Sequence, residues 1–293
     1  MSRLSLKQIE YFRAVMETGT VSGAAALLHV SQPNVSRMLK YTESRLGLGL
    51  FQREHGRLLA TPEAHALFRE VQSLHLHLES VQEAVDRIAS GQLDRFPVGA
   101  SPSLGRFVVP SLLSRLRRDF PSLPIKLDIL SVSQVMDYLA YGQGECACTI
   151  FPVADPRIES QTFATGALVC AVPRDHRLSG AAAISPQDIT GETLIAFDAN
   201  TPHGRVVAQF FGQAPMPRIA CTVRFAESAC ALAEQGNGIA LVDEFTVSGG
   251  AFPNLVAVPV RFRRPFRIYF HRASERPLSA AGVRLRELLS RWQ

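Results

Sequence analysis

A regular apolar repeat in the first third of the chain is the feature that most restricts its fold. The apolar positions are separated alternately by four and three residues: Leu67, Val71, Leu74, Leu78, Val81, Val85 and Ile88. This spacing places them on one stripe of a continuous α-helix, as in a coiled coil. Thr61-Pro62 and Ser90-Gly91 supply start and stop signals, so we predict a helix of about 28 residues, roughly 42 Å long. We expect the stripe to pair with a second copy of the chain; packing on its own domain is the alternative.

Short helices are predicted before this long one. "LKQIEYFRAVMETG" carries apolar residues at helical spacing and stops at Gly19. The Ala-rich "TVSGAAALLHV" follows, with Thr20 or Ser22 as its N-cap. Another helix then begins at Ser31, with Pro33 in its first turn, after only the short turn "LHVS". Two helices joined by so short a turn indicate a helix-turn-helix.

The helix after this turn carries an unusual density of hydrogen-bonding side chains. Val35, Met38 and Leu39 can face inward, which leaves polar residues on the outer face and at the N-terminal end. Arg pairs well with guanine and Asn or Gln with adenine, while hydroxyls and Lys reach phosphates. The alternative is an ordinary solvated face. We predict DNA contacts at Ser31, Gln32, Pro33, Asn34, Ser36, Arg37 and Lys40.

Two short apolar runs flank the turn "REHG" in "RLGLGLFQREHGRLLATP". This pattern predicts a β-hairpin wing, whose Arg53, His55 and Arg57 can follow a phosphate backbone or a minor groove. A plain surface hairpin is the alternative. Residues 1–60 hold eight Lys or Arg against four Asp or Glu, which agrees with a polyanionic partner.

Composition narrows the class of protein further. The chain has 293 residues, 46% of them hydrophobic, with no apolar run long enough to cross a membrane and no signal-peptide pattern at its start. We therefore expect a cytoplasmic protein. The five cysteines lie at positions 146, 148, 170, 221 and 230, and their spacing suits neither a zinc site nor a redox pair. We expect buried thiols, no cofactor and no metal.

From about residue 93 the pattern changes to alternating strands and helices. Strand-like segments such as "FPVGAS", "PIKLDIL", "TLIAF" and "GIALVD" are separated by helical text such as "FVVPSLLSRLRRDFP". This alternation predicts an α/β domain with largely parallel sheets, and about 200 residues suffice for two lobes.

The N-terminal text resembles the LysR-type transcriptional regulators. "FRAVMETGTVSGAAALLHVSQPNVSRMLKYTESRLGLGLFQRE" keeps that family's Ala-Ala in the second helix, Ser-Gln-Pro-x-Val-Ser at the recognition helix and Leu-Gly-x-x-Leu-Phe-x-Arg before the wing. "VPRDHRL" and "AEQGNGIALVD" extend a looser match to the C-terminus. The text is most similar to the branch of lysine-biosynthesis and opine-catabolism regulators.

The resemblance implies an α/β protein with an N-terminal winged helix-turn-helix at 1–60, a linker and dimerisation helix at 61–91, and a two-lobed effector-binding domain like the periplasmic binding proteins at 92–293. It also implies a homodimer or homotetramer that binds promoter DNA and a small-molecule effector. An amino-acid-like compound or a small carboxylate is the expected effector.

The effector is expected at the carboxyl ends of parallel strands. Hydroxyl-bearing loops follow three predicted strands and can hold a carboxylate, although plain helix capping explains each loop alone. Asp198 and Asp243 can meet an amine or a guanidinium. The predicted effector-binding residues are Ser101, Pro102, Ser103, Ser131, Ser133, Phe151, Asp198, Asn200, Thr201, Phe225 and Asp243.

Two other classes of protein are alternatives to a DNA-binding regulator. A cytoplasmic enzyme would need a catalytic motif, and the sequence holds no H-E-x-x-H, no G-x-S-x-G and no P-loop. A solute-binding protein would explain the α/β cleft, but not the N-terminal 60 residues. We therefore predict no catalytic residues and a DNA-binding regulator.

Overall fold

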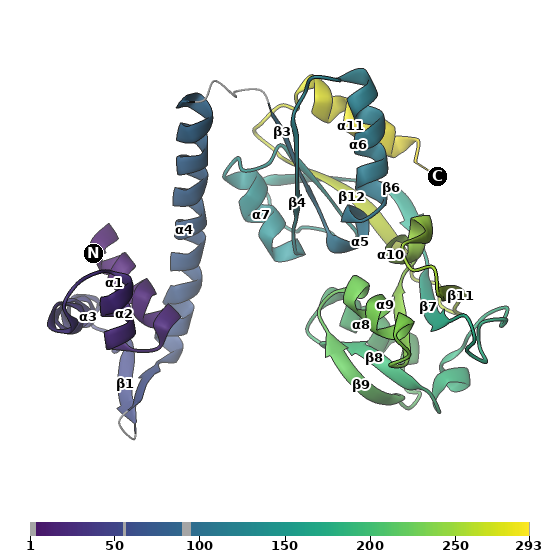
Figure 1. Cartoon of the computed structure of the whole chain (residues 1–293), viewed down its shortest axis with the longest axis horizontal. Helices are drawn as coiled ribbons and strands as arrows, with labels where there is room; N and C mark the ends of the chain where they lie inside the picture. Colours follow the sequence, from purple (N-terminus) through teal and green to yellow (C-terminus); the bar gives the residue numbers. More distant parts are fainter. Residues whose placement is uncertain (1–3, 55–56, 90–94, 293) are drawn as a thin grey trace. The chain divides into compact units, whose positions relative to one another are not determined.

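The computed structural model describes residues 4–54, 57–89 and 95–292. The chain divides into two compact units, Met1–Gly91 and Gln92–Gln293 (Figure 1). The long predicted helix belongs to the first unit, and the predicted α/β domain forms the second.

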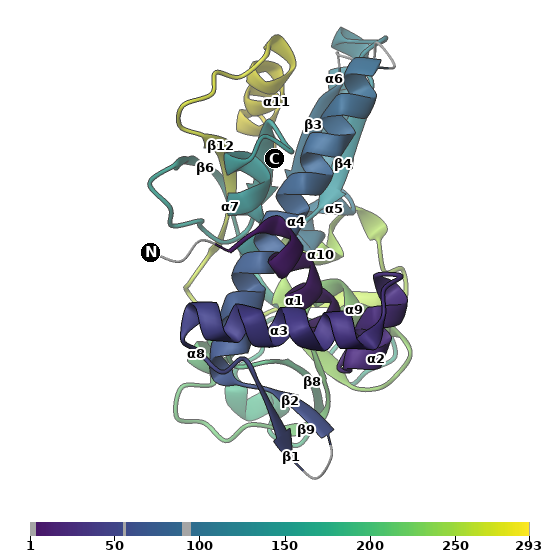
Figure 2. The ribbon, with the colours of Figure 1, turned by 90° about the vertical axis from the view of Figure 1, so that its left-hand side faces the viewer.

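Three helices open the first unit: α1 (Leu6–Thr18), α2 (Val21–Leu27) and α3 (Gln32–Leu46) (Figure 2). α1 ends at Gly19, whose positive φ of 67° is readily adopted by glycine. The hydroxyl of Thr20 caps α2 by accepting a hydrogen bond from the amide of Gly23, 3.0 Å away. Between α2 and α3 the chain turns sharply at His29, which has a φ of 53°.

A hairpin and a long helix complete this unit. β1 (Phe51–Glu54) pairs antiparallel with β2 (Arg57–Ala60), as the wing pattern predicted. The carboxylate of Glu43 on α3 accepts hydrogen bonds from the amides of Leu50 and Phe51, at 2.8 and 3.0 Å, and so ties the start of the hairpin to α3. α4 (Pro62–Ala89) follows at once, and the hydroxyl of Thr61 accepts a hydrogen bond from its first turn.

The apolar stripe of α4 has two different environments. Leu67 and Val71 pack into the core of their own unit with Phe12 and Leu50, and only 4% of Val71 is exposed. Further along the helix, Leu78 is 47% exposed, Val81 61% and Val85 50%. Leu74 is half-buried, and the side chain of Ile88 lies outside the described part of the chain. The first part of the predicted dimer stripe therefore packs within the unit, because the helix starts directly against α1.

The second unit contains two five-stranded sheets, one in each lobe. In the first lobe the order is β4 (Ile125–Ile129), β3 (Phe96–Ala100), β5 (Cys146–Thr149), β12 (Phe266–Ala273) and β6 (Ile158–Gly166). In the second lobe it is β11 (Leu255–Pro259), β7 (Leu168–Pro173), β10 (Ile239–Asp243), β8 (Thr193–Phe197) and β9 (Arg218–Val223).

Both sheets are mixed, which corrects the expectation of largely parallel sheets. β4, β3 and β5 are parallel to one another, as are β10, β8 and β9. β12 runs antiparallel to β5 and β6, and β7 runs antiparallel to β10 and β11. The alternating sequence pattern could not show this, because β7 and β12 each enter a sheet after the chain has come from the other lobe.

Helices flank the two sheets (Figure 1). Those of the first lobe are α5 (Pro102–Gly105), α6 (Val108–Asp119), α7 (Val132–Ala140) and α11 (Ala280–Ser290). The others are α8 (Pro202–Phe211), α9 (Ala226–Glu234) and α10 (Glu244–Val247), with 3₁₀ turns at Pro186–Ile189 and Ser248–Gly250.

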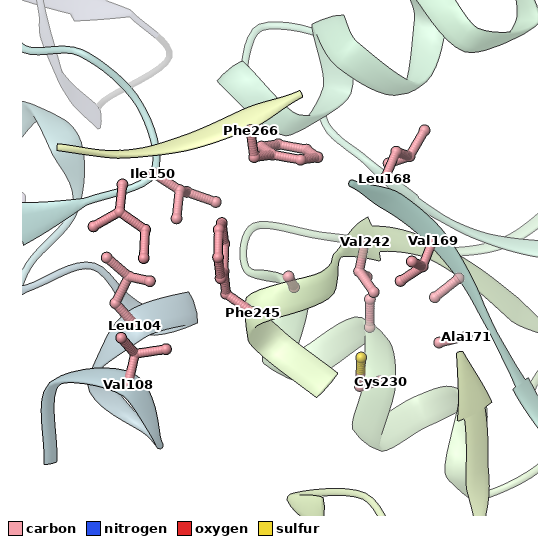
Figure 3. Close-up of a cluster of buried hydrophobic side chains, with 14 of the residues drawn as sticks. Leu104, Val108, Ile150, Leu168, Val169, Ala171, Cys230, Val242, Phe245 and Phe266 are labelled. Atoms are coloured by element: carbon pink, nitrogen blue, oxygen red, sulfur yellow. The ribbon is translucent and has the colours of Figure 1, made fainter. Parts of the chain in front are cut away.

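One apolar core spans both lobes of this unit. Figure 3 shows Phe245 of α10 between Leu104 and Ile150 on one side and Val242 on the other. Four of the five cysteines are buried and only Cys221 is partly exposed; none forms a disulfide. Burial raises the pKa of the Cys148 and Cys170 thiols to about 12, so both are unreactive at neutral pH. No helix among the described residues is long and apolar enough to span a membrane.

Candidate functional site

The outer face of α3 presents a row of polar side chains. Buried Val35 and Leu39 fix the inner face of the helix against α1 and α2, so the orientation of the outer face is determined. Ser36 is half-buried. The other predicted DNA-contacting residues of this helix are exposed: Ser31, Gln32, Pro33, Asn34, Arg37 and Lys40.

These polar groups are available to a ligand. Ser31 occupies the N-cap position of α3, yet its hydroxyl makes no capping hydrogen bond. Within the described part of the chain, the side chains of Gln32, Asn34, Arg37 and Lys40 form no hydrogen bond or ion pair, so a partner would displace no internal contact. Tyr41, 56% exposed on the same helix, was not among the predicted contacts.

The predicted wing is only partly described. Arg53 lies in β1 opposite Leu58, and Arg57 lies in β2 opposite Glu54. Predicted contact His55 falls outside the described residues. The hairpin therefore brings two of the three predicted basic positions onto neighbouring strands beside α3.

The second unit contains a cavity of about 400 Å³ between its two lobes. It lies where parallel strands end: β3, β4 and β5 from the first lobe and β8 and β9 from the second, as expected for ligand sites in α/β folds. Its lining consists of Ser101, Pro102, Ser103, Leu130, Ser131, Val132, Ser133, Ile150, Phe151, Asn200, Thr201, Pro202, His203, Arg224, Phe225 and Ala226.

The structure brings together nine of the eleven predicted effector-binding residues in this lining; Asp198 and Asp243 are not part of it. Asp198 is exposed, and its carboxylate accepts a hydrogen bond from the amide of Asn200, 2.8 Å away. The hydroxyl of Thr201 donates to the backbone carbonyl of Asp198, at 2.6 Å. Asp198 therefore shapes the loop before α8 and does not enter the cavity.

Asp243 is fully buried behind the lining. Its Oδ2 accepts hydrogen bonds from the hydroxyls of Ser103 and Thr246, both 2.9 Å away, and lies 3.0 Å from Nε2 of His203. Its Oδ1 accepts from the amide of Thr246, at 3.0 Å. The carboxylate thus fixes a serine of the first lobe and a histidine of the second, both of which line the cavity. It is a positioning residue, and the expected contact between Asp243 and a ligand amine is not what the geometry favours.

His203 lines the cavity but was not predicted. Its ring stacks on Phe197, with centroids 4.9 Å apart; Phe151 lies nearly perpendicular to it and the tilted ring of Phe266 completes an aromatic enclosure. Its Nδ1 has no partner among the described residues. The sequence gives no local signal for it, because its partners lie 40 or more positions away or on other elements. "TPHG" indicates only a helix start, although Gly204 is required there: a Cβ at this position would lie 2.1 Å from the carbonyl oxygen of Asp198.

The hydroxyl of Ser101 is the least satisfied polar group of the site. Ser101 is 5% exposed, and its Oγ is buried with no hydrogen-bond partner. Leaving such a group unsatisfied costs about 1–3 kcal/mol. In contrast, Ser131 and Ser133 lie 3.0 Å apart through their hydroxyl oxygens, and Ser131 also donates to Gln134.

Ser103, Asp243 and His203 do not form a hydrolase triad. In such a triad the histidine lies between the serine and the carboxylate and takes the proton of the serine. Here Asp243 lies in the middle, and Ser103 donates its proton to that carboxylate. No group of three or more potential metal ligands occurs in the described part of the chain. The arrangement can bind and orient a small molecule, but it offers no activated nucleophile.

Two family models match the chain. Residues 94–293 match the LysR substrate binding domain, and residues 6–65 match the bacterial regulatory helix-turn-helix protein, lysR family. The chain is 30% identical to the octopine catabolism/uptake operon regulatory protein OccR of Rhizobium meliloti, over 96% of this chain and 91% of that protein. It is 28% identical to the transcriptional activator protein LysR of Escherichia coli, over 96% of this chain and 90% of that protein.

Solved structures share the fold. CbnR, a LysR family regulator solved in complex with its target DNA, superposes with a TM-score of 0.67 at 24% identity, covering 98% of this chain and 99% of that chain. Full-length BenM gives a TM-score of 0.56 at 25% identity, covering 98% and 96%. Both units of the protein thus have counterparts in the same order, and the chain belongs to the LysR family: it is a DNA-binding transcriptional regulator with an effector-binding domain.

Proposed function

We propose that α3 reads operator DNA through its exposed face. The observation that carries this proposal is the set of unpaired polar side chains on α3, held outward by the buried residues behind them. Gln32, Asn34 and Arg37 are suited to base edges, while Ser31, Ser36 and Lys40 are suited to phosphates. Arg53, His55 and Arg57 of the wing would add backbone contacts.

The exposed part of the α4 stripe supports assembly as a homodimer, from which a tetramer can be built. Leu78, Val81 and Val85 form an apolar row that is costly to leave in water. A two-fold dimer would present two copies of α3 to a palindromic operator. We further propose that the protein works in the cytoplasm, where bacterial promoters are found.

We infer that the cavity between the lobes holds the effector, an amino-acid-like compound or a small carboxylate. Its lining combines hydroxyls from Ser101, Ser103, Ser131, Ser133 and Thr201 with apolar and aromatic walls. Few polar groups in a mostly apolar pocket are typical of small-molecule sites. DNA binding and ligand binding thus lie in separate units of the chain.

The test begins with selection of preferred sequences from random double-stranded DNA. Fluorescence anisotropy at fixed salt then measures the affinity of the protein for the selected duplex. We expect the selected duplex to bind at least a thousandfold more tightly than random DNA, roughly the usual specificity ratio. Equal binding of both duplexes would refute operator recognition. A thermal-shift screen of the same preparation against amino acids, opines and small acids tests the effector site, because a ligand stabilises the state that it binds.

A further inference from the structure

We propose that the effector is a small carboxylate with an apolar body and no cationic group. This inference rests on the proposed function of the cavity and narrows it. It excludes free amino acids, which carry an ammonium group beside the carboxylate. Three features of the cavity support this inference: the charges of its lining, the helices that begin there, and one unsatisfied hydroxyl.

The lining carries positive but no negative groups. Arg224 is the one Lys or Arg in the described lining, and its guanidinium carbon lies 5.4 Å from the ring centre of Phe225, which also lines the cavity. The described lining contains no Asp or Glu. A ligand anion would therefore gain from the lining, whereas an ammonium group would be desolvated without a partner, at a large cost.

Three helices of sufficient length begin at the cavity wall. α7 starts after Ser131, α8 after Thr201 and α9 after Phe225, and all three of these residues line the cavity. The N-terminus of a helix carries a partial positive charge and unpaired amides, both of which favour an anion. Because these three helix starts converge on one cavity, they add to the preference for a negative ligand.

The buried Oγ of Ser101 is independent evidence for a polar ligand atom. It is the one buried side-chain oxygen or nitrogen in the described residues that has no hydrogen-bond partner. A carboxylate oxygen entering the cavity would accept its proton in a charge-assisted hydrogen bond. The ordinary alternative, an N-cap bond within the chain, is not made by this hydroxyl.

The nearby acidic groups are not available to an ammonium group. Both carboxylate oxygens of Asp243 already accept hydrogen bonds, from Ser103, Thr246 and His203. The residue is also fully buried behind the cavity lining. Glu227, on the first turn of α9, does not line the cavity. Burial raises the pKa of Glu227, with the charge of Arg106 opposing this effect.

The rest of the wall is apolar and selects the body of the ligand. Leu130, Val132 and Ile150 contribute aliphatic surface, and Phe151 and Phe225 contribute rings. At about 400 Å³ the cavity is near the lower end of the range for small-molecule sites. An aryl or branched-chain acid fits this combination of size, charge and surface.

Sets of matched compounds test the inference in the full-length protein. One set is 3-phenylpropanoate, phenylalanine and 2-phenylethylamine; the other is 4-methylpentanoate, leucine and isopentylamine. Each set keeps the apolar body and varies the carboxylate and the ammonium group. Calorimetry at millimolar ligand should detect binding of at least one acid, with its amino acid at least tenfold weaker and its amine not bound.

Two variants then assign the contacts. Ser101→Ala and Arg224→Gln should each weaken binding of that acid by about tenfold, as expected for a lost charge-assisted hydrogen bond. Arg115→Gln, an exposed arginine on α6, is the matched control and should bind the acid as the wild type does. Tighter binding of either amino acid than of its matched acid would overturn the inference, and so would binding of neither acid.

DNA binding measured on the same samples separates this inference from the proposed function. If the protein selects an operator but prefers an amino acid, only the ligand class is wrong. If it shows no preference among DNA sequences, the proposed reading of DNA by α3 fails, whatever the calorimetry shows.

Discussion

The Nε2 atom of His203 lies 3.0 Å from Oδ2 of Asp243, although the two residues come from different elements and are 40 positions apart. The same oxygen accepts a hydrogen bond from the hydroxyl of Ser103, which is 140 positions away in the other lobe. A buried carboxylate thus joins the two sides of the ligand cavity. No Lys or Arg among the described residues forms an ion pair with it, so its charge is stabilised by the hydrogen bonds from Ser103, Thr246 and His203.

Replacing Asp243 by Asn should destabilise the effector domain. The amide keeps only one accepting oxygen, so its NH2 group must face either the backbone amide of Thr246 at Oδ1 or the donors that converge on Oδ2. We expect a loss of about 3 kcal/mol, the scale for a broken buried pair. Differential scanning fluorimetry should show a lower melting temperature than wild type. Asp198→Asn is the control: its carboxylate is exposed, and an amide oxygen can still accept from Asn200.

Ser101→Ala and Ser103→Ala should have opposite effects on the ligand-free protein. The Ser101 hydroxyl has no partner to lose, so its removal should raise stability by about 1 kcal/mol. Ser103 donates to Asp243, so its removal should lower stability by a similar amount. The measurement is the melting temperature of each variant without ligand, compared with that of the wild type. A destabilised Ser101→Ala protein would mean that the hydroxyl already has a partner.

Arg37→Ala should weaken binding to the selected operator by about 1–3 kcal/mol. The reason is that Arg37 is exposed on α3 and has no internal partner in the described residues. Anisotropy at fixed salt measures the loss, and a salt titration shows whether a phosphate contact was removed. Arg115→Ala changes the net charge equally but lies in the other unit. If the two variants bind operator alike, Arg37 makes no specific contact.

Charges in the exposed part of the α4 stripe should dissociate the dimer. Leu78→Asp with Val85→Asp places two carboxylates in an apolar interface, while both positions are about half exposed in the single chain. The monomer should therefore stay folded. Sedimentation velocity gives the mass, and circular dichroism checks the helix content. Gln72→Asp, exposed on the same helix outside the stripe, should remain dimeric; a dimer in the double variant would place the interface elsewhere.

His271 should make the effector domain less stable in mild acid. Its ring is fully buried, and burial lowers its pKa to about 4 from the ordinary value of about 6.5. Between these values the unfolded chain binds a proton that the folded chain does not, so stability falls as pH falls from about 6.5 to about 4. At pH 5 the loss relative to pH 7 is about 2 kcal/mol.

The hydrogen bonds of His271 fix which ring nitrogen carries the proton. Thr149 donates its proton to the carbonyl of Phe151, 2.5 Å away, and must therefore accept from Nε2 of His271 at 2.7 Å. Nδ1 is then left to accept from Ser160, also at 2.7 Å. His271→Gln should flatten the dependence of melting temperature on pH in this range. An unchanged slope would assign the acid sensitivity to another group.

The elements that depend on local sequence were largely predictable. The helix-turn-helix, the start of α4 at Pro62 and the parallel strands follow from caps, short turns and apolar spacing. The antiparallel course of β7 and β12 depends on where the chain crosses between lobes, which no local pattern records. The first part of the α4 stripe was assigned to a partner for the same reason: the pattern shows an apolar face but not what covers it.

In the cavity between the lobes, too, features set by local sequence were predictable and features set by tertiary contacts were not. Loops after strands were predictable because hydroxyl residues there coincide with helix starts, and nine of the predicted residues line one cavity. His203 could not be found in this way, because Phe151, Phe266 and Asp243, which surround it, come from segments at least 40 positions away. Asp243 was expected to meet an amine or a guanidinium of the ligand, but its full burial favours another role: it orients the neighbouring side chains of the cavity.

The uneven burial of the five cysteines has a practical consequence. Cys146, Cys148, Cys170 and Cys230 are buried, and burial raises the pKa of each thiol. Cys221 is partly exposed on β9, the edge strand of the second lobe. A maleimide dye applied briefly at neutral pH should therefore attach at one position of the unmodified protein. Fluorescence from that dye would report on the second lobe during ligand titrations, without any cysteine having been removed.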